Sequence, residues 1–172
     1  GRTQETGHKT LGHICVTEED KRSASESHGP LLYGELLPRG VNKALDGRHL
    51  DAQRASCLFD LGMGTGKVAM QAFLQFPNLK RVYGVELSLA RYKVAERACL
   101  KLASTDARAL AVHSHAPGTS IAVKNVATQQ ILHVVHGNLM QTRDIERANI
   151  IMLETEIPSD SFSEFSVLLD AA

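Results

Sequence analysis

The glycine-rich stretch Asp60-Leu-Gly62-Met-Gly64-Thr-Gly66 has residue types and a spacing that are suited to holding a small ligand. Glycines in a tight turn let the backbone approach a bound molecule closely and direct free N–H groups at it. One acidic residue, Asp60, precedes the turn, and another, Glu86, follows Gly62 by 24 residues. Glycines flanked by two carboxylates therefore predict a binding site at this turn, and the competing interpretation is a purely structural turn.

Three classes of ligand bind to glycine turns of this kind, and neighbouring residues distinguish them. A dinucleotide fingerprint, G-x-G-x-x-G, requires a third glycine where this sequence has Lys67. A phosphate-binding loop, G-x-x-x-x-G-K-[ST], matches at Gly66-Lys67, but Leu61 occupies its first glycine position and Val68 replaces its magnesium-binding hydroxyl. Both classes are disfavoured. The remaining pattern, an acidic residue followed by G-x-G-x-G, resembles the first motif of class I S-adenosylmethionine methyltransferases.

This resemblance implies a set of contacts with S-adenosyl-L-methionine. The cofactor has no pyrophosphate, so Gly62, Gly64 and Gly66 need only accommodate its amino-acid end. Asp60 is expected to attract its ammonium or sulfonium charge. Glu86 is expected to accept hydrogen bonds from the ribose hydroxyls, by analogy with the acid about 20 residues beyond the first glycine in dinucleotide sites.

Alternating strands and helices are predicted around these residues. Apolar runs predict strands over 57–61, 81–85, 131–135 and 149–153, and helical spacing predicts helices over 37–45, 68–76, 89–102 and 162–169. The glycine turn lies between the first strand and a helix, and Glu86 directly follows the second strand. This order predicts an α/β protein of the Rossmann-like, doubly wound type, with a mostly parallel sheet.

The predicted domain organisation is a polar arm over 1–30, expected to be mobile, followed by one cofactor-binding domain over 31–172. Connections between elements usually have about 2–6 residues, so residues 103–129 are expected to be an insertion that holds a further helix or a floppy loop. A doubly wound sheet has about five to seven strands. The four predicted strands therefore indicate a sheet that is truncated after its fourth strand.

A second motif, Tyr33-Gly34-Glu35-Leu-Leu-Pro, precedes the glycine turn by about 25 residues. Together with Asp-Leu-Gly-x-Gly-x-Gly and the Gly-Val-Glu that ends at Glu86, it resembles the non-SET histone-lysine methyltransferases called disruptor of telomeric silencing. The resemblance implies that Tyr33, Gly34 and Glu35 form a loop over the cofactor. It covers 31–102 well and 131–158 loosely, and leaves the arm and the insertion outside.

The later part of the chain both follows and departs from this family. Residues 137–139 align with a family Gly-Asp-Phe near the adenine, which implies that Asn138 hydrogen-bonds the ring amine and that Leu139 packs on its face. Leu87, next to Glu86, belongs to the same expected cofactor-binding set. The family has Asn-Asn-Phe-Ala-Phe after the fourth strand, whereas this chain has Leu-Glu-Thr-Glu-Ile-Pro over 153–158, where Glu154 can attract a cationic amine.

The family resemblance implies transfer of a methyl group to a protein lysine, on a histone or a nucleosome. Such a reaction is a single displacement by a neutral amine and is helped mainly by positioning in a dry channel. Tyr33, Glu35 and Glu154 are the candidate catalytic residues. The alternatives are a methyltransferase with a non-histone acceptor and a catalytically degenerate binding module.

Composition limits the classes of partner. The chain has 172 residues, 22% of them charged, which excludes collagen-like and wholly disordered proteins. Its 19 Lys and Arg balance 19 Asp and Glu, so no long-range attraction to nucleic acid or an anionic membrane is expected. No apolar run approaches the roughly 18–20 residues that span a bilayer, so no membrane partner is expected. From Asp144 onward, seven acidic residues accompany one basic residue, Arg147, which favours a cationic acceptor.

Cysteines and histidines give no sign of a metal site or a disulfide framework. The three cysteines are widely separated, which is typical of reduced thiols in an intracellular protein. His113, His115, His133 and His136 lack Cys or carboxylate partners at ligand spacing, so no metal is expected.

The basic residues of the 89–102 helix are expected to line its solvent-exposed face; they are Arg91, Lys93, Arg97 and Lys101. We also expect a monomer. The family resemblance implies a nuclear location, and without it a cytoplasmic one would be expected.

Overall fold

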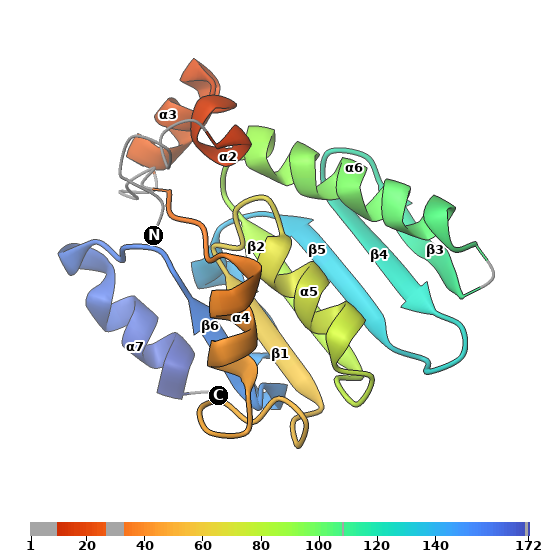
Figure 1. Ribbon diagram of the computed structural model, residues 1–172. Helices are drawn as coiled ribbons and strands as arrows, with labels where there is room; N and C mark the ends of the chain where they lie inside the picture. Colours follow the sequence, from red (N-terminus) through yellow and green to blue (C-terminus); the bar gives the residue numbers. More distant parts are fainter. Residues whose placement is uncertain (1–9, 27–32, 108, 171) are drawn as a thin grey trace.

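The computed structural model describes residues 10–26, 33–107, 109–170 and 172. Within these residues, one sheet of six strands has the order β3-β4-β5-β2-β1-β6 (Figure 1). The strands are β1 (Cys57–Leu61), β2 (Arg81–Glu86), β3 (Leu110–Ala116), β4 (Ser120–Asn125), β5 (Ile131–His136) and β6 (Ile150–Leu153). The helices are α2 (Leu11–Ile14), α3 (Glu18–Glu26), α4 (Pro38–Leu45), α5 (Lys67–Gln75), α6 (Leu89–Thr105) and α7 (Phe162–Asp170).

The sheet is mixed and mostly parallel. Strands β5, β2, β1 and β6 run parallel to one another, whereas β3 and β4 form an antiparallel hairpin whose second strand pairs antiparallel with β5. The four parallel strands are those predicted from the sequence, and the α/β class is confirmed. The expectation of a helix or a floppy loop over 103–129 is wrong, because this segment adds two strands to the sheet.

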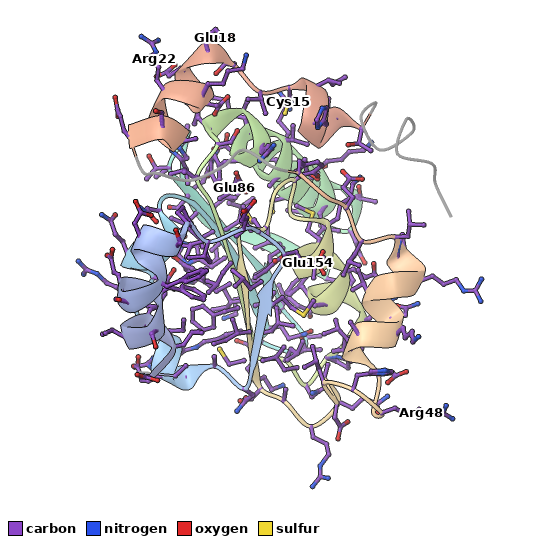
Figure 2. All side chains as sticks on the ribbon, turned by 90° about the vertical axis from the view of Figure 1, so that its left-hand side faces the viewer. Cys15, Glu18, Arg22, Arg48, Glu86 and Glu154 are labelled. Atoms are coloured by element: carbon purple, nitrogen blue, oxygen red, sulfur yellow. The ribbon has the colours of Figure 1, made fainter. Side chains whose placement is uncertain are left out.

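Helices cover both faces of the sheet (Figures 1 and 2). Alternate strand residues such as Leu58, Val82 and Leu132 pack with α4, α5 and α6 in the larger hydrophobic cluster. Intervening residues such as Phe59 and Leu61 pack with α7 through Phe165. Strand β1 is buried along its whole length, as expected of an inner strand of a parallel sheet that is covered on both faces.

Residues 10–26, which we call the N-terminal strap, form α2 and α3 beside the start of α6 (Figure 1). The expectation of a mobile arm over 1–30 is therefore wrong for these residues, while 1–9 and 27–30 lie outside the described part. The polar composition suggested a mobile segment, but one of these polar side chains is buried and holds α3 against the rest of the protein. Asp20 is buried and accepts a hydrogen bond from the backbone N–H of Ala90, in the first turn of α6.

No helix of the described residues is long and apolar enough to cross a membrane. The longest, α6, has an alternation of buried and exposed residues along its length. Its N-cap is Ser88, whose hydroxyl oxygen accepts the backbone N–H of Arg91 over 3.2 Å. This N-cap satisfies one of the free donors at the start of the helix and fixes where α6 begins relative to the end of β2.

Candidate cofactor and substrate cleft

A cleft of about 300 Å³ lies where the carboxyl ends of β1, β2 and β6 meet. The 33–36 segment, the turn between β1 and α5, the loop after β5 and the segment after β6 form its walls. Every predicted site residue except Gly66 lines it. Glu86 and Glu154, which belong to different walls, are labelled between α7 and α4 in Figure 2.

The glycine turn is built on left-handed backbone conformations. Gly62 has φ 78° and Gly64 has φ 57°, which residues with a Cβ rarely adopt. A Cβ at Gly62 would lie 3.0 Å from the Thr155 side chain, and one at Gly64 would lie 2.6 Å from the Tyr33 ring. Gly66 also has a positive φ, but a Cβ there would meet Ala95 of α6. Gly66 therefore allows α5 and α6 to pack closely and does not line the cleft.

Asp60 connects the end of β1 to the start of α5. Its Oδ2 accepts the backbone N–H of Ala69 over 3.1 Å, in the first turn of a helix whose own N-cap, Gly66, has no side chain to offer. Burial raises the pKa of Asp60 most, the Ala69 N–H lowers it, and the carboxylates of Glu154 and Glu86 raise it; the resulting pKa is about 7. The Asp60 carboxyl therefore changes between its protonated and ionised forms near neutral pH.

Glu86 connects the end of β2 to the glycine turn and to α6. Its Oε2 accepts the backbone N–H of Gly64 over 2.8 Å, and its Oε1 accepts that of Ser88 over 2.9 Å. The guanidinium of Arg91 lies 3.9 Å from Oε1. Burial raises the pKa of Glu86, and these N–H groups and Arg91 counteract that rise. The carboxylate is therefore held firmly at the wall of the cleft.

The segment with Tyr33 and Glu35 forms a hydrogen-bonded wall. The Tyr33 hydroxyl donates to Glu35 Oε1 over 2.7 Å and lies 3.1 Å from Thr65 Oγ1. Glu35 Oε2 accepts from Lys67 Nζ over 2.6 Å. Burial raises the pKa of Tyr33, so the phenol stays neutral and can donate. Gly34, between the two, has open space where a Cβ would be.

The loop after β5 carries the two residues expected near an adenine. Asn138 Oδ1 accepts the backbone N–H of Met140 over 2.9 Å and so caps the 3₁₀ turn Leu139–Gln141. Leu139 is partly buried at the cleft wall. The carbonyl of Leu87 accepts from His136 Nε2 over 3.0 Å, which ties the end of β5 to the residue after Glu86.

The segment after β6 brings acidic residues to the wall of the cleft next to the glycine turn. Glu154 is exposed to solvent and lines the cleft, and partial burial there raises its pKa. Glu156 also lines this wall, beside Thr155. Leu153 pairs with Leu61, and the Thr155 side chain lies against Gly62, so the carboxylates of this wall are beside the glycine turn.

Among the lining residues that were not predicted as site residues, three contact predicted ones through polar or charged groups: Thr65, Lys67 and Arg91. Arg91 was expected on the solvent-exposed face of α6, and this is wrong, because only 4% of it is exposed. A basic residue in the first turn of a helix is disfavoured by the helix dipole. That unfavourable position was a signal that Arg91 has acidic partners nearby.

The histidines lie on two strands that β4 separates. His113 and His115 belong to β3, and His133 and His136 belong to β5. Among the residues that the structure describes, no group of three or more His, Cys, Asp or Glu side chains could hold a metal ion.

A mostly parallel sheet with helices on both faces, and a glycine turn between acidic residues at its carboxyl edge, is consistent with a Rossmann-like methyltransferase fold. Residues 13–108 match the family described as Histone methylation protein DOT1. The chain belongs to this family, as its motifs predicted. The match begins at residue 13, so it includes most of the N-terminal strap, which was expected to lie outside. No curated protein matches the chain.

Proposed function

We propose that this protein transfers a methyl group from S-adenosyl-L-methionine to a lysine of a histone in the nucleus. Membership of the DOT1 family supports both the cofactor and the substrate. The observation that carries the proposal is the convergence of the predicted residues on one cleft: the glycine turn, Glu86 and Glu154 all line it. Clefts at this edge of parallel sheets are where α/β proteins bind their ligands.

The residues of the cleft fit S-adenosyl-L-methionine. Side chains at Gly62 or Gly64 would collide with Thr155 or Tyr33, so the close packing of this turn at the cleft requires glycine at both positions. Asp60 and Glu86 are buried carboxylates, suited to a positive charge and to hydroxyl groups respectively. The cleft volume of about 300 Å³ is within the range of small-molecule sites.

Bound S-adenosyl-L-methionine supplies an electrophilic methyl group. The contribution of the chain is to orient the two reactants and to exclude water. In this proposal the hydroxyl of Tyr33 and the carboxylate of Glu35 brace the loop over the cofactor, since they are hydrogen-bonded to each other. Glu154 attracts the cationic amine and, with its raised pKa, is suited to accept the proton that the amine loses.

Calorimetric titration with S-adenosyl-L-methionine and with S-adenosylhomocysteine tests cofactor binding. The wild type is expected to bind both, and Glu86→Ala to bind at least about tenfold more weakly, because a buried acceptor of hydrogen bonds is lost. Glu146→Ala, at an exposed position of the 3₁₀ turn Ile145–Arg147, is the matched control and should bind like the wild type. No heat from the wild type would refute the proposal.

Methyl transfer from labelled cofactor to nucleosomes, free histones and a cell extract tests the acceptor. Label on a histone lysine is the expected result. Label only on other molecules of the extract would support a non-histone acceptor.

A binding module without catalysis is the second candidate. The wall after β6 favours it, since Glu154 and Glu156 stand where the family carries amides and aromatics that shape the lysine channel. Cofactor binding without transfer to any acceptor, by protein whose fold is verified, would favour this candidate.

A further inference from the structure

The N-terminal strap is in direct contact with the wall of the cleft. The carbonyl of Gly12, in α2, accepts a hydrogen bond from Arg91 Nε over 2.9 Å. The Tyr33 ring packs so closely against Gly12 that a Cβ at this position would overlap it. Gly64 of the glycine turn is in contact with the same ring, so Tyr33 lies between the strap and the cofactor-binding turn.

Asp20 anchors the strap at the start of α6. Its Oδ1 accepts the backbone N–H of Ala90, and its Oδ2 accepts the backbone N–H and the hydroxyl of Thr17. Burial opposes its ionisation, but the hydrogen bonds from Thr17, Ser88 and Ala90 outweigh burial and lower the pKa of Asp20. A carboxylate at the start of α6 is also favoured by the helix dipole.

Arg91 connects the strap to two side chains of the cleft. Its guanidinium lies 4.6 Å from the centroid of the Tyr33 ring, a distance typical of a cation–π contact. Its Nη1 lies 3.9 Å from Glu86 Oε1. One buried cation therefore contacts Gly12 in the strap, the ring of Tyr33 and the carboxylate of Glu86. A buried charge depends on its partners, so losing one contact weakens the restraint on the others.

We propose that Arg91 is a positioning residue that couples docking of the N-terminal strap to the binding of the cofactor. With the strap docked, Arg91 holds Tyr33 against the glycine turn and Glu86 at the cleft wall. The inference rests on the proposed function for the identity of the ligand. Coupling between two sites is reciprocal, so the bound cofactor also holds the strap more tightly.

The first experiment needs no cofactor and measures hydrogen exchange of the backbone amides of α2 and α3. In Arg91→Met, the exchange of these amides should be about tenfold faster than in the wild type, because a charged hydrogen bond and a cation–π contact are lost. Amides of α5 serve as the internal control for global unfolding. Unchanged exchange in α2 and α3 would overturn the coupling.

The second experiment loosens the strap through a residue that does not line the cleft. Asp20→Ala should weaken the binding of S-adenosylhomocysteine by about fivefold, because the strap loses the carboxylate that anchors it to α6. Glu18→Ala is the matched control, since Glu18 belongs to the same helix and 83% of its side chain is exposed. It should bind like the wild type. Equal affinities of Asp20→Ala and wild type would overturn the proposal.

Combining the variants separates coupling from general destabilisation. Asp20→Ala in the Arg91→Met background should cause no further loss of affinity, because the link through which the strap acts is already broken. Arg91→Lys should restore part of the affinity, since a lysine keeps the charge beside Glu86 but lacks the planar guanidinium. Fully additive losses would contradict the proposal. If the wild type binds no cofactor, the proposed function fails, whereas the exchange experiment still decides whether Arg91 holds the strap.

Discussion

The backbone N–H of Gly64 donates to Glu86 Oε2 over 2.8 Å and so joins the glycine turn to the end of β2. Both residues are buried, and a hydrogen bond to a charged group is strengthened where water is excluded. The other oxygen of Glu86 is held by the N–H of Ser88. The turn and the acid therefore form one unit, and a change at either residue should affect both.

Gly64→Ala should destabilise the protein and abolish cofactor binding. At φ 57° an alanine costs about 1–2 kcal/mol, and its Cβ would also meet the Tyr33 ring. Gly118→Ala is the control, because Gly118 also has a positive φ but has open space around it. Urea unfolding should show a larger loss of unfolding free energy for Gly64→Ala. Equal losses would mean that the Tyr33 ring moves aside freely.

Asp60 should make the protein less stable as the pH rises toward neutrality. Its pKa in the folded protein is about 7, above the value of about 3.9 in unfolded chains. The folded state then binds more protons, so this contribution is fully present below about pH 4 and is lost as the pH rises through about 7. The difference in unfolding free energy between wild type and Asp60→Asn, measured against pH, should follow this course. A difference that is independent of pH would contradict it.

Cofactor binding should have the opposite dependence on pH. A cationic ligand beside Asp60 favours the ionised carboxylate, so binding releases a proton and the affinity rises as the pH increases through about 7. Calorimetry in buffers of different ionisation enthalpy measures the released proton directly. Asp60→Asn should bind more weakly and with less dependence on pH. Proton uptake by the wild type would disprove the role given to Asp60.

Tyr33→Phe and Tyr33→Ala should differ in effect. The phenylalanine loses the hydrogen bond to Glu35, which corresponds to about 1–2 kcal/mol of unfolding free energy, but keeps the ring beneath Arg91. The alanine also removes the ring that lies between Gly12 and Gly64. Thermal unfolding and calorimetry should therefore place Tyr33→Ala well below Tyr33→Phe in both stability and cofactor affinity. If the two variants have the same stability and the same affinity, the Tyr33 hydroxyl accounts for the whole effect and the ring for none of it.

The sequence predicted the parallel strands well because they are buried on both faces. Continuous apolar runs mark such strands, and the run 57–61 coincides with β1. The hairpin was missed because β3 lies at the edge of the sheet and only Leu110 in it is buried, so no alternation of apolar and polar residues appears. Its local signals were the Pro117-Gly118 turn between two segments of similar length and the short apolar run 121–123, which is buried in β4.

The residues expected to contact a ligand were easier to predict than the residues that hold them in place. The spacing of the site residues in the sequence indicates that they lie close together. Asp60 and Glu86 lie at the ends of neighbouring strands, and the glycines form the turn between β1 and α5. Arg91 was misplaced because a long side chain in the first turn of a helix can point outward or into the protein, and the choice depends on Gly12 and Tyr33. These are tertiary contacts that no local pattern encodes.

The β3–β4–β5 segment also has a consequence for the kinetics of folding. Leu110 pairs with Asn125, 15 residues later, whereas Leu58 pairs with Ile150, 92 residues later. Closing a longer loop costs more chain entropy, so we expect the antiparallel segment to form early and the β1–β6 pairing to form late. Pulse-labelled amides of β4 should then become protected before those of β6. Since the cleft has walls at both β1 and β6, the ability to bind a ligand should appear only in the final folding step.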